Sequence, residues 1–139
     1  MNEIISINNE NMFLINDFIN NAGDSLINFR YFSERNLDVV KNHLHTCVIL
    51  SKNNTIAYGH LDYEDENIWL GVAVAQNFRG NGLGKKIVMH LIKYASDNNL
   101  NKIKLSVDTS NNKAINLYKS LGFNFLERND EKCFMLKNL

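Results

Sequence analysis

The stretch VAVAQNFRGNGLGKKIV, residues 72–88, contains the clearest change of pattern in the chain. It begins as a short run of valine and alanine, which is typical of a buried strand, and continues into a loop rich in glycine. From Leu83 to Ala95 apolar residues recur with helical period, which predicts an amphipathic helix. Residues 102–107 then alternate as a strand. Strand, glycine loop, helix and strand form a crossover unit, so part of the sheet is predicted to be parallel.

The segments on either side of this unit complete a mixed α/β pattern. Asn9 is expected to cap the first helix, and Ser33 or Asn36 to open the second. The order β-α-α-β-β-β-α-β-α-β-β predicts one mixed, partly parallel central sheet with helices on both faces, in a single domain over residues 1–139. The expected strands are 4–7, 46–50, 55–63, 68–75, 102–107, 123–127 and 132–136, and the expected helices are 10–21, 37–44, 83–97 and 111–121.

Composition excludes several classes of protein. Fifteen Lys and Arg balance fifteen Asp and Glu, which argues against nucleic acid or an acidic membrane as a partner. No apolar run approaches the roughly 18 residues of a membrane helix, and the N-terminus lacks a signal-peptide pattern. Cys47 and Cys133 are far apart and are interpreted as core residues in a reducing cytoplasm, the expected location. Without a CxxC spacing or closely spaced histidines, no metal site is predicted.

The glycine loop itself predicts an anion site. Gly80, Gly82 and Gly84 allow unusual backbone angles, and the helix that follows offers unpaired N–H groups and the positive end of its dipole. Arg79 and Lys85 could add charge, although a plain tight turn would use the same glycines. The spacing matches neither a P-loop nor a dinucleotide fingerprint.

Two blocks of sequence resemble those of a known family. Arg79-x-x-Gly82-x-Gly84 is similar to the R/Q-x-x-G-x-G/A signature of the GNAT-type N-acetyltransferases, and the strand before it resembles theirs. The block from Asn111 through Tyr118 to Phe123 resembles the second conserved block of that family. The resemblance implies the GNAT acyltransferase fold, with acetyl-CoA as the cofactor in a cleft between the strands at 68–75 and 102–107.

The same resemblance implies how that cofactor is held. The pyrophosphate would lie on backbone N–H groups of the loop, and the pantetheine arm along the free edge at Val72 and Val74. The N–H of Val72 or Ala73 could polarise the thioester, and Asn111 would contact the CoA arm. The implied cofactor-binding residues are Val72, Ala73, Val74, Arg79, Gly80, Asn81, Gly82, Leu83, Gly84, Lys85, Asn111 and Tyr118.

The implied chemistry needs an acid and a base. Tyr118 matches the family tyrosine near the CoA sulfur, a general acid, although a core aromatic would show the same spacing. The strand at 68–75 lacks the carboxylate that many relatives use as a base. His60 and Asp62 are two residues apart on the preceding strand, so they share a face and are the candidate base pair; a polar surface face is the alternative.

Phe29, Arg30 and Tyr31, together with His60 and Trp69, are the expected acceptor-binding residues, although a loop packed on the core is the alternative. The predicted function is transfer of an acetyl group to a primary amine of a small molecule, such as an amino sugar or nucleotide sugar. The alternatives are acetylation of protein N-termini or lysines, or a CoA-binding regulatory module without turnover. The chain is expected to act as a monomer or homodimer.

Overall fold

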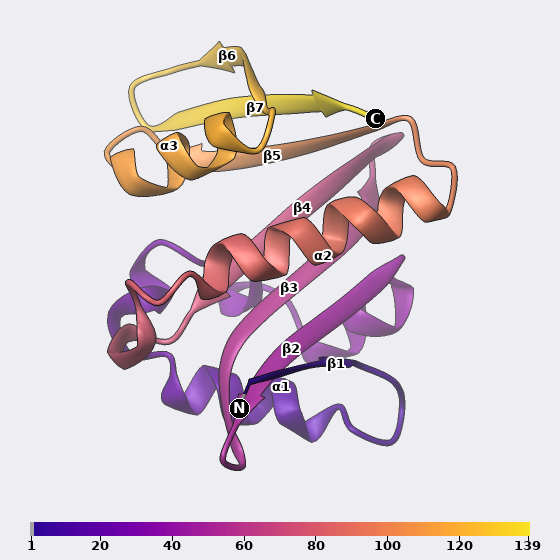
Figure 1. The fold of residues 1–139 in the computed structure, drawn as a ribbon, viewed down its shortest axis with the longest axis vertical. Coiled ribbons are helices and arrows are strands. Elements are labelled where there is room, and N and C mark those ends of the chain that lie inside the picture. Colours follow the sequence, from indigo (N-terminus) through magenta and orange to yellow (C-terminus); the bar gives the residue numbers. More distant parts are fainter. Residues whose placement is uncertain (1) are drawn as a thin grey trace.

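The computed structural model describes residues 2–139 and contains one mixed sheet (Figure 1). Its seven strands lie in the order β1-β2-β3-β4-β5-β7-β6. The strands are β1 (Glu3–Ser6), β2 (His45–Ser51), β3 (Asn54–Glu64), β4 (Asn67–Val74), β5 (Lys102–Asp108), β6 (Asn124–Arg128) and β7 (Lys132–Asn138). The α-helices are α1 (Phe13–Asn21), α2 (Leu83–Asp97) and α3 (Asn112–Ser120). The short 3-10 helices are η1 (Gly23–Ile27), η2 (Tyr31–Ser33), η3 (Leu37–Asn42) and η4 (Gln76–Phe78).

Helices cover both faces of the sheet, as the sequence predicts. Because side chains alternate along a strand, Cys47 joins the core under α2 and α3, whereas Val48 joins the core under α1. Gly59 lets α2 approach closely, since a Cβ there would lie 2.3 Å from the Ile87 side chain. The fold class is therefore confirmed, with two apolar layers on one sheet.

The first two expected helices differ from the structure, and α1 starts at Phe13 and not at residue 10. The predicted helix at 37–44 is the 3-10 helix η3, opened by Asn36, whose side chain accepts from the Asp38 N–H. Asn9 does not cap α1; the Asn8 side chain instead accepts from the backbone N–H groups of Glu10 and Asn11, one turn before the helix. Sequence spacing alone cannot decide which of two adjacent asparagines accepts these backbone hydrogen bonds. Among residues 2–139, no helix is both long and apolar enough to cross a membrane.

The crossover from β4 through α2 to β5 creates the one parallel pair of the sheet within residues 2–139. These strands are paired only at Trp69 and Lys104. Beyond this point β4 continues to Val74 and β5 to Asp108, but the two strands no longer pair with each other. The two strands therefore separate towards their C-terminal ends, where α2 and α3 begin.

Candidate active site

A cleft of about 900 Å³ opens where β4 and β5 separate. It is lined by β4, the glycine loop, the ends of β5 and α3, and the segment before β2. All of the site residues predicted from the sequence line it except Asn81. Those residues are Phe29, Arg30, Tyr31, His60, Asp62, Trp69, Val72, Ala73, Val74, Arg79, Gly80, Gly82, Leu83, Gly84, Lys85, Asn111 and Tyr118.

The edge of β4 presents free backbone groups to the cleft. The Ala75 N–H donates to the Ile56 carbonyl of β3. Because backbone groups alternate along an antiparallel ladder, the Ala73 N–H also faces β3, whereas the N–H groups of Val72 and Val74 face β5. The Ala73 N–H is thus used within the sheet, so of the two expected thioester donors Val72 is the one that can reach a ligand. The Val74 carbonyl already accepts from the Ser25 hydroxyl at 2.5 Å.

The glycine loop has the form of an anion cradle. Gly80 and Gly82 have φ values of +82° and +76°, and a Cβ at either would meet nothing within 4 Å. They are therefore needed for backbone conformation and not for packing. The N–H groups of residues 82–85 donate to no acceptor within residues 2–139, and they stand at the N-terminus of α2. Free N–H groups at the positive end of a helix dipole suit a phosphate.

Two side chains of the loop serve its attachment. The Arg79 guanidinium pairs with Asp24 and donates to the Ser25 hydroxyl at 2.6 Å. The Asn81 side chain does not line the cleft and donates to the Phe78 carbonyl at 3.1 Å. Arg79 therefore fixes the loop to η1. Lys85 also lines the cleft, and its side chain makes no hydrogen bond or salt bridge within the described residues.

Tyr118 lies on α3 with its ring packed edge-on to Phe123. The residue is 7% exposed, and burial raises its pKa well above the ordinary value. Its hydroxyl makes no hydrogen bond within residues 2–139. In that range Thr55 Oγ1 is the one side-chain polar atom that is both buried and unpartnered, so the Tyr118 oxygen is accessible. The phenol is therefore protonated at neutral pH and opens onto the cleft, which leaves it free to donate to a ligand.

Asn111 lies at the start of α3, and its side-chain oxygen caps the helix by accepting from the Ala114 N–H at 3.3 Å. Its amide nitrogen remains without a partner within the described residues. Lys113 and Lys132 also line the cleft and were missed by sequence reasoning. Lys113 is two residues after Asn111 and could have been proposed from that spacing, whereas Lys132 comes from β7 and had no such signal.

His60 is buried below the acceptor end of the cleft. Its Nδ1 lies 2.7 Å from the Tyr58 hydroxyl, and Gly71 on β4 leaves room for the ring. Burial, with the nearby His43 and Arg35, lowers its pKa well below the usual value. His60 is therefore neutral at pH 7 and is a weak base.

Asp62 contacts Tyr31 and not its strand neighbour His60. Its carboxylate accepts from the Tyr31 hydroxyl at 2.8 Å, and that hydroxyl lies 2.7 Å from His43 Nε2. The His43 Nδ1 is in turn 2.8 Å from the Thr46 hydroxyl. Burial lowers the pKa of His43 to about 4, so this chain of groups holds a neutral imidazole beside a carboxylate. The aromatic ring of Tyr31 covers His60, with 4.3 Å between ring centroids.

The remaining predicted acceptor residues, Arg30 and Trp69, line the cleft and have partners of their own. Arg30 bridges it by donating to both oxygens of Asp108 on β5, at 3.0 and 3.3 Å. This contact occupies the guanidinium of Arg30, one of the expected acceptor-binding residues. Trp69 donates to the Glu64 carbonyl and packs edge-on to Phe134.

Comparison with known proteins identifies the class to which this cleft belongs. A family model described as the acetyltransferase (GNAT) family matches residues 10–123. The chain therefore belongs to the GNAT acetyltransferase family, as the sequence blocks around Gly82 and Tyr118 suggest.

Individual relatives differ in what they acetylate. The chain is 42% identical over 52 residues to mycothiol acetyltransferase of Pseudarthrobacter chlorophenolicus, covering 37% of this chain and 16% of that protein. It is 40% identical over 60 residues to the ribosomal protein bS18-alanine N-acetyltransferase of Salmonella typhimurium, covering 43% of this chain and 40% of that protein. The chain thus spans less than half of either curated relative.

Among solved structures, the PaiA N-acetyltransferase of Thermoplasma acidophilum in complex with coenzyme A has the same fold. Its TM-score is 0.76 at 12% identity, over 100% of this chain and 99% of that one.

Proposed function

We propose that this chain transfers the acetyl group of acetyl-CoA to a primary amine of a small molecule. The observation that supports this most is the coincidence, in one cleft, of free N–H groups at residues 82–85, a free strand edge at Val72 and an unpartnered phenol at Tyr118. Acetyl-CoA supplies the acetyl group as a thioester. The pyrophosphate of acetyl-CoA would bind the N–H groups of the loop, and its pantetheine arm would pair with the edge of β4 like an added strand.

The chain's own residues supply the proton transfers. Tyr118, held protonated by burial, donates to the departing sulfur. The Val72 N–H is the backbone donor placed to stabilise developing negative charge on the carbonyl oxygen. Of the two candidate bases on β3, Asp62 is the better group to bind the acceptor ammonium and take its proton, since His60 resists protonation.

The acceptor end favours a compact amine. Phe29 and Tyr31 stack at 6.4 Å between ring centroids, and the Arg30 contact with Asp108 spans the cleft beside them. A small amine can be bound by the aromatic rings of Phe29 and Tyr31 and the carboxylate of Asp62 alone. A protein N-terminus is the second candidate, because one curated relative is named for acetylation of a ribosomal protein alanine.

A panel assay separates these functions. CoA release is measured by thiol detection with amino sugars, nucleotide amino sugars, lysine analogues and peptides with an N-terminal alanine. We expect the highest kcat/KM with a small amine. Preference for the peptide would favour the protein substrate, and tight acetyl-CoA binding without turnover on any amine would indicate a regulatory module.

A further inference from the structure

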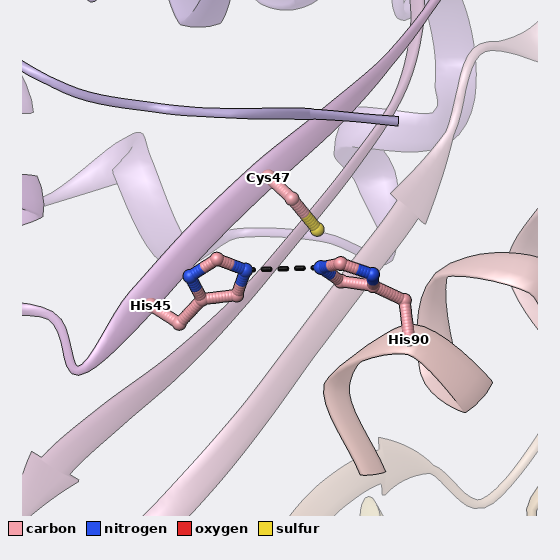
Figure 2. A group of neighbouring side chains, drawn as sticks. All are labelled: His45, Cys47 and His90. Carbon is pink, nitrogen blue, oxygen red and sulfur yellow. Dashed lines mark hydrogen bonds between the residues drawn. The ribbon is translucent and has the colours of Figure 1, made fainter. Parts of the chain in front are cut away.

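A second group of chemically active side chains lies between β2 and α2, outside the cleft. His45 and Cys47 are two residues apart on β2, so both point towards α2. His90 comes from the middle of α2 and faces them (Figure 2). None of the three lines the large cleft.

The three side chains converge at one point. Nε2 of His45 lies 3.0 Å from Nε2 of His90, and the Cys47 sulfur joins them with all ligand atoms within 4.8 Å of one another. In a tetrahedral zinc site with bonds of 2.0–2.3 Å, ligand atoms are about 3.3–3.6 Å apart. The nitrogens are already near this spacing, and the Cys47 sulfur lies within 4.8 Å of both.

The surrounding residues hold this arrangement in place. The His45 ring stacks on Tyr94, with 4.2 Å between centroids and an interplanar angle of 7°. The Tyr94 hydroxyl in turn donates to the Leu44 carbonyl. Cys47 is buried, whereas both histidines are partly exposed.

We propose that His45, Cys47 and His90 form a binding site for a borderline-soft divalent cation, of which Zn²⁺ fits best. Two imidazoles and one thiolate are a common zinc donor set, and the exposed side leaves the fourth position to water. Binding releases the thiol proton of Cys47 to solvent, and the neutral imidazoles coordinate without losing a charge. The bound ion clamps α2 to β2 behind the cleft.

Sequence spacing could not find this site, since His90 is separated from Cys47 by two strands and the glycine loop. Without a metal, the same residues form a hydrogen-bonded pair of neutral histidines beside a buried thiol. The two interpretations differ in measurable ways.

The test uses the untagged chain, stripped with a chelator, so that no affinity tag binds metal. Zn²⁺ is titrated against a chromophoric chelator, and Co²⁺ is added separately and followed by absorption. We expect one equivalent of either ion, a thiolate-to-cobalt charge-transfer band, tetrahedral d–d bands and a rise in Tm with Zn²⁺. Absence of saturable binding, or a cobalt spectrum without the thiolate band, would overturn the proposal.

Variants assign the ligands. His90→Gln, on a partly exposed helix position, should weaken Zn²⁺ binding at least about tenfold, and Cys47→Ala should also abolish the charge-transfer band. The matched control is Cys133→Ala, which removes the other buried free cysteine and should change neither. Circular dichroism confirms that each variant folds. Unchanged binding in a folded His90→Gln variant would contradict the site even if Cys47→Ala fails to fold.

Discussion

Tyr118 shows how burial and an open hydroxyl together define a role. The ring is packed in the core beside Phe123, so its position is fixed, while the oxygen has no partner within residues 2–139. A tyrosine needed only for packing would lose little when its hydroxyl is removed. A proton donor would lose its function.

We therefore expect Tyr118→Phe to lower kcat about 100-fold or more while the KM for acetyl-CoA stays within about threefold. Steady-state kinetics with the best acceptor from the panel measures both. Tyr63→Phe, at a 59% exposed tyrosine of β3, is the matched control and should behave as wild type. If kcat of Tyr118→Phe equals that of wild type, Tyr118 has no part in proton transfer.

Asp62 gives a second prediction at this scale. Because its carboxylate is the proposed site for the acceptor ammonium, Asp62→Asn should raise the acceptor KM and lower kcat, together by about tenfold or more in kcat/KM. Acetyl-CoA affinity, measured by calorimetry, should not change. A loss confined to acetyl-CoA affinity would place Asp62 outside the acceptor site.

At the scale of elements, the glycine loop and α2 act as a unit. The loop is attached to η1 through Arg79, and its free N–H groups are presented by the first turn of α2. The sequence could predict this unit, because a strand, closely spaced glycines and an apolar helical repeat are all local patterns. It could not predict that the Arg79 side chain is turned to Asp24, since that contact joins residues 55 apart.

Gly82 separates a binding role from a structural one. Gly82→Ala forces a side chain into the left-handed region, which costs about 1–2 kcal/mol of folding free energy or shifts the loop. We expect the KM for acetyl-CoA to rise about tenfold, because the N–H groups lose alignment with the anion.

The matched control is Gly122→Ala, outside the cleft, where φ is +95° and a Cβ would meet the Lys137 side chain at 2.6 Å. It should lose a similar free energy of unfolding without a change in the KM for acetyl-CoA. Equal KM values in the two variants would remove the loop from cofactor binding.

At the scale of the whole molecule, the sheet with helices on both faces places the cleft between two halves that meet at a single parallel pair. The order of elements and the two blocks that resemble the GNAT family predicted this arrangement, and every predicted site residue except Asn81 lines the cleft. What sequence reasoning missed depends on tertiary contact. Asp62 accepts a hydrogen bond from Tyr31 and not from His60, and His90 of α2 meets Cys47 of β2.

Buried His60 predicts an acid dependence of stability. Its pKa is lowered in the folded state, by burial first and then by His43 and Arg35, so the unfolded chain binds the proton more readily. The free energy of unfolding should therefore be highest above about pH 7 and fall as the pH drops below about 6.5, by about 1.4 kcal/mol per pH unit for this histidine.

Urea unfolding in chelator between about pH 7.5 and about pH 5 measures this slope. His60→Gln should reduce the slope by about one proton, whatever its effect on stability at neutral pH. An unchanged slope would mean that His60 titrates alike in the folded and unfolded chain.

If the opening between β4 and β5 holds acetyl-CoA, a crystal structure of the chain with CoA will show the ligand there. We predict the pyrophosphate on the N–H groups of residues 82–85, the pantetheine arm along Val72 and the sulfur facing the Tyr118 hydroxyl. CoA bound elsewhere, or a cleft without CoA at saturating concentration, would contradict the account.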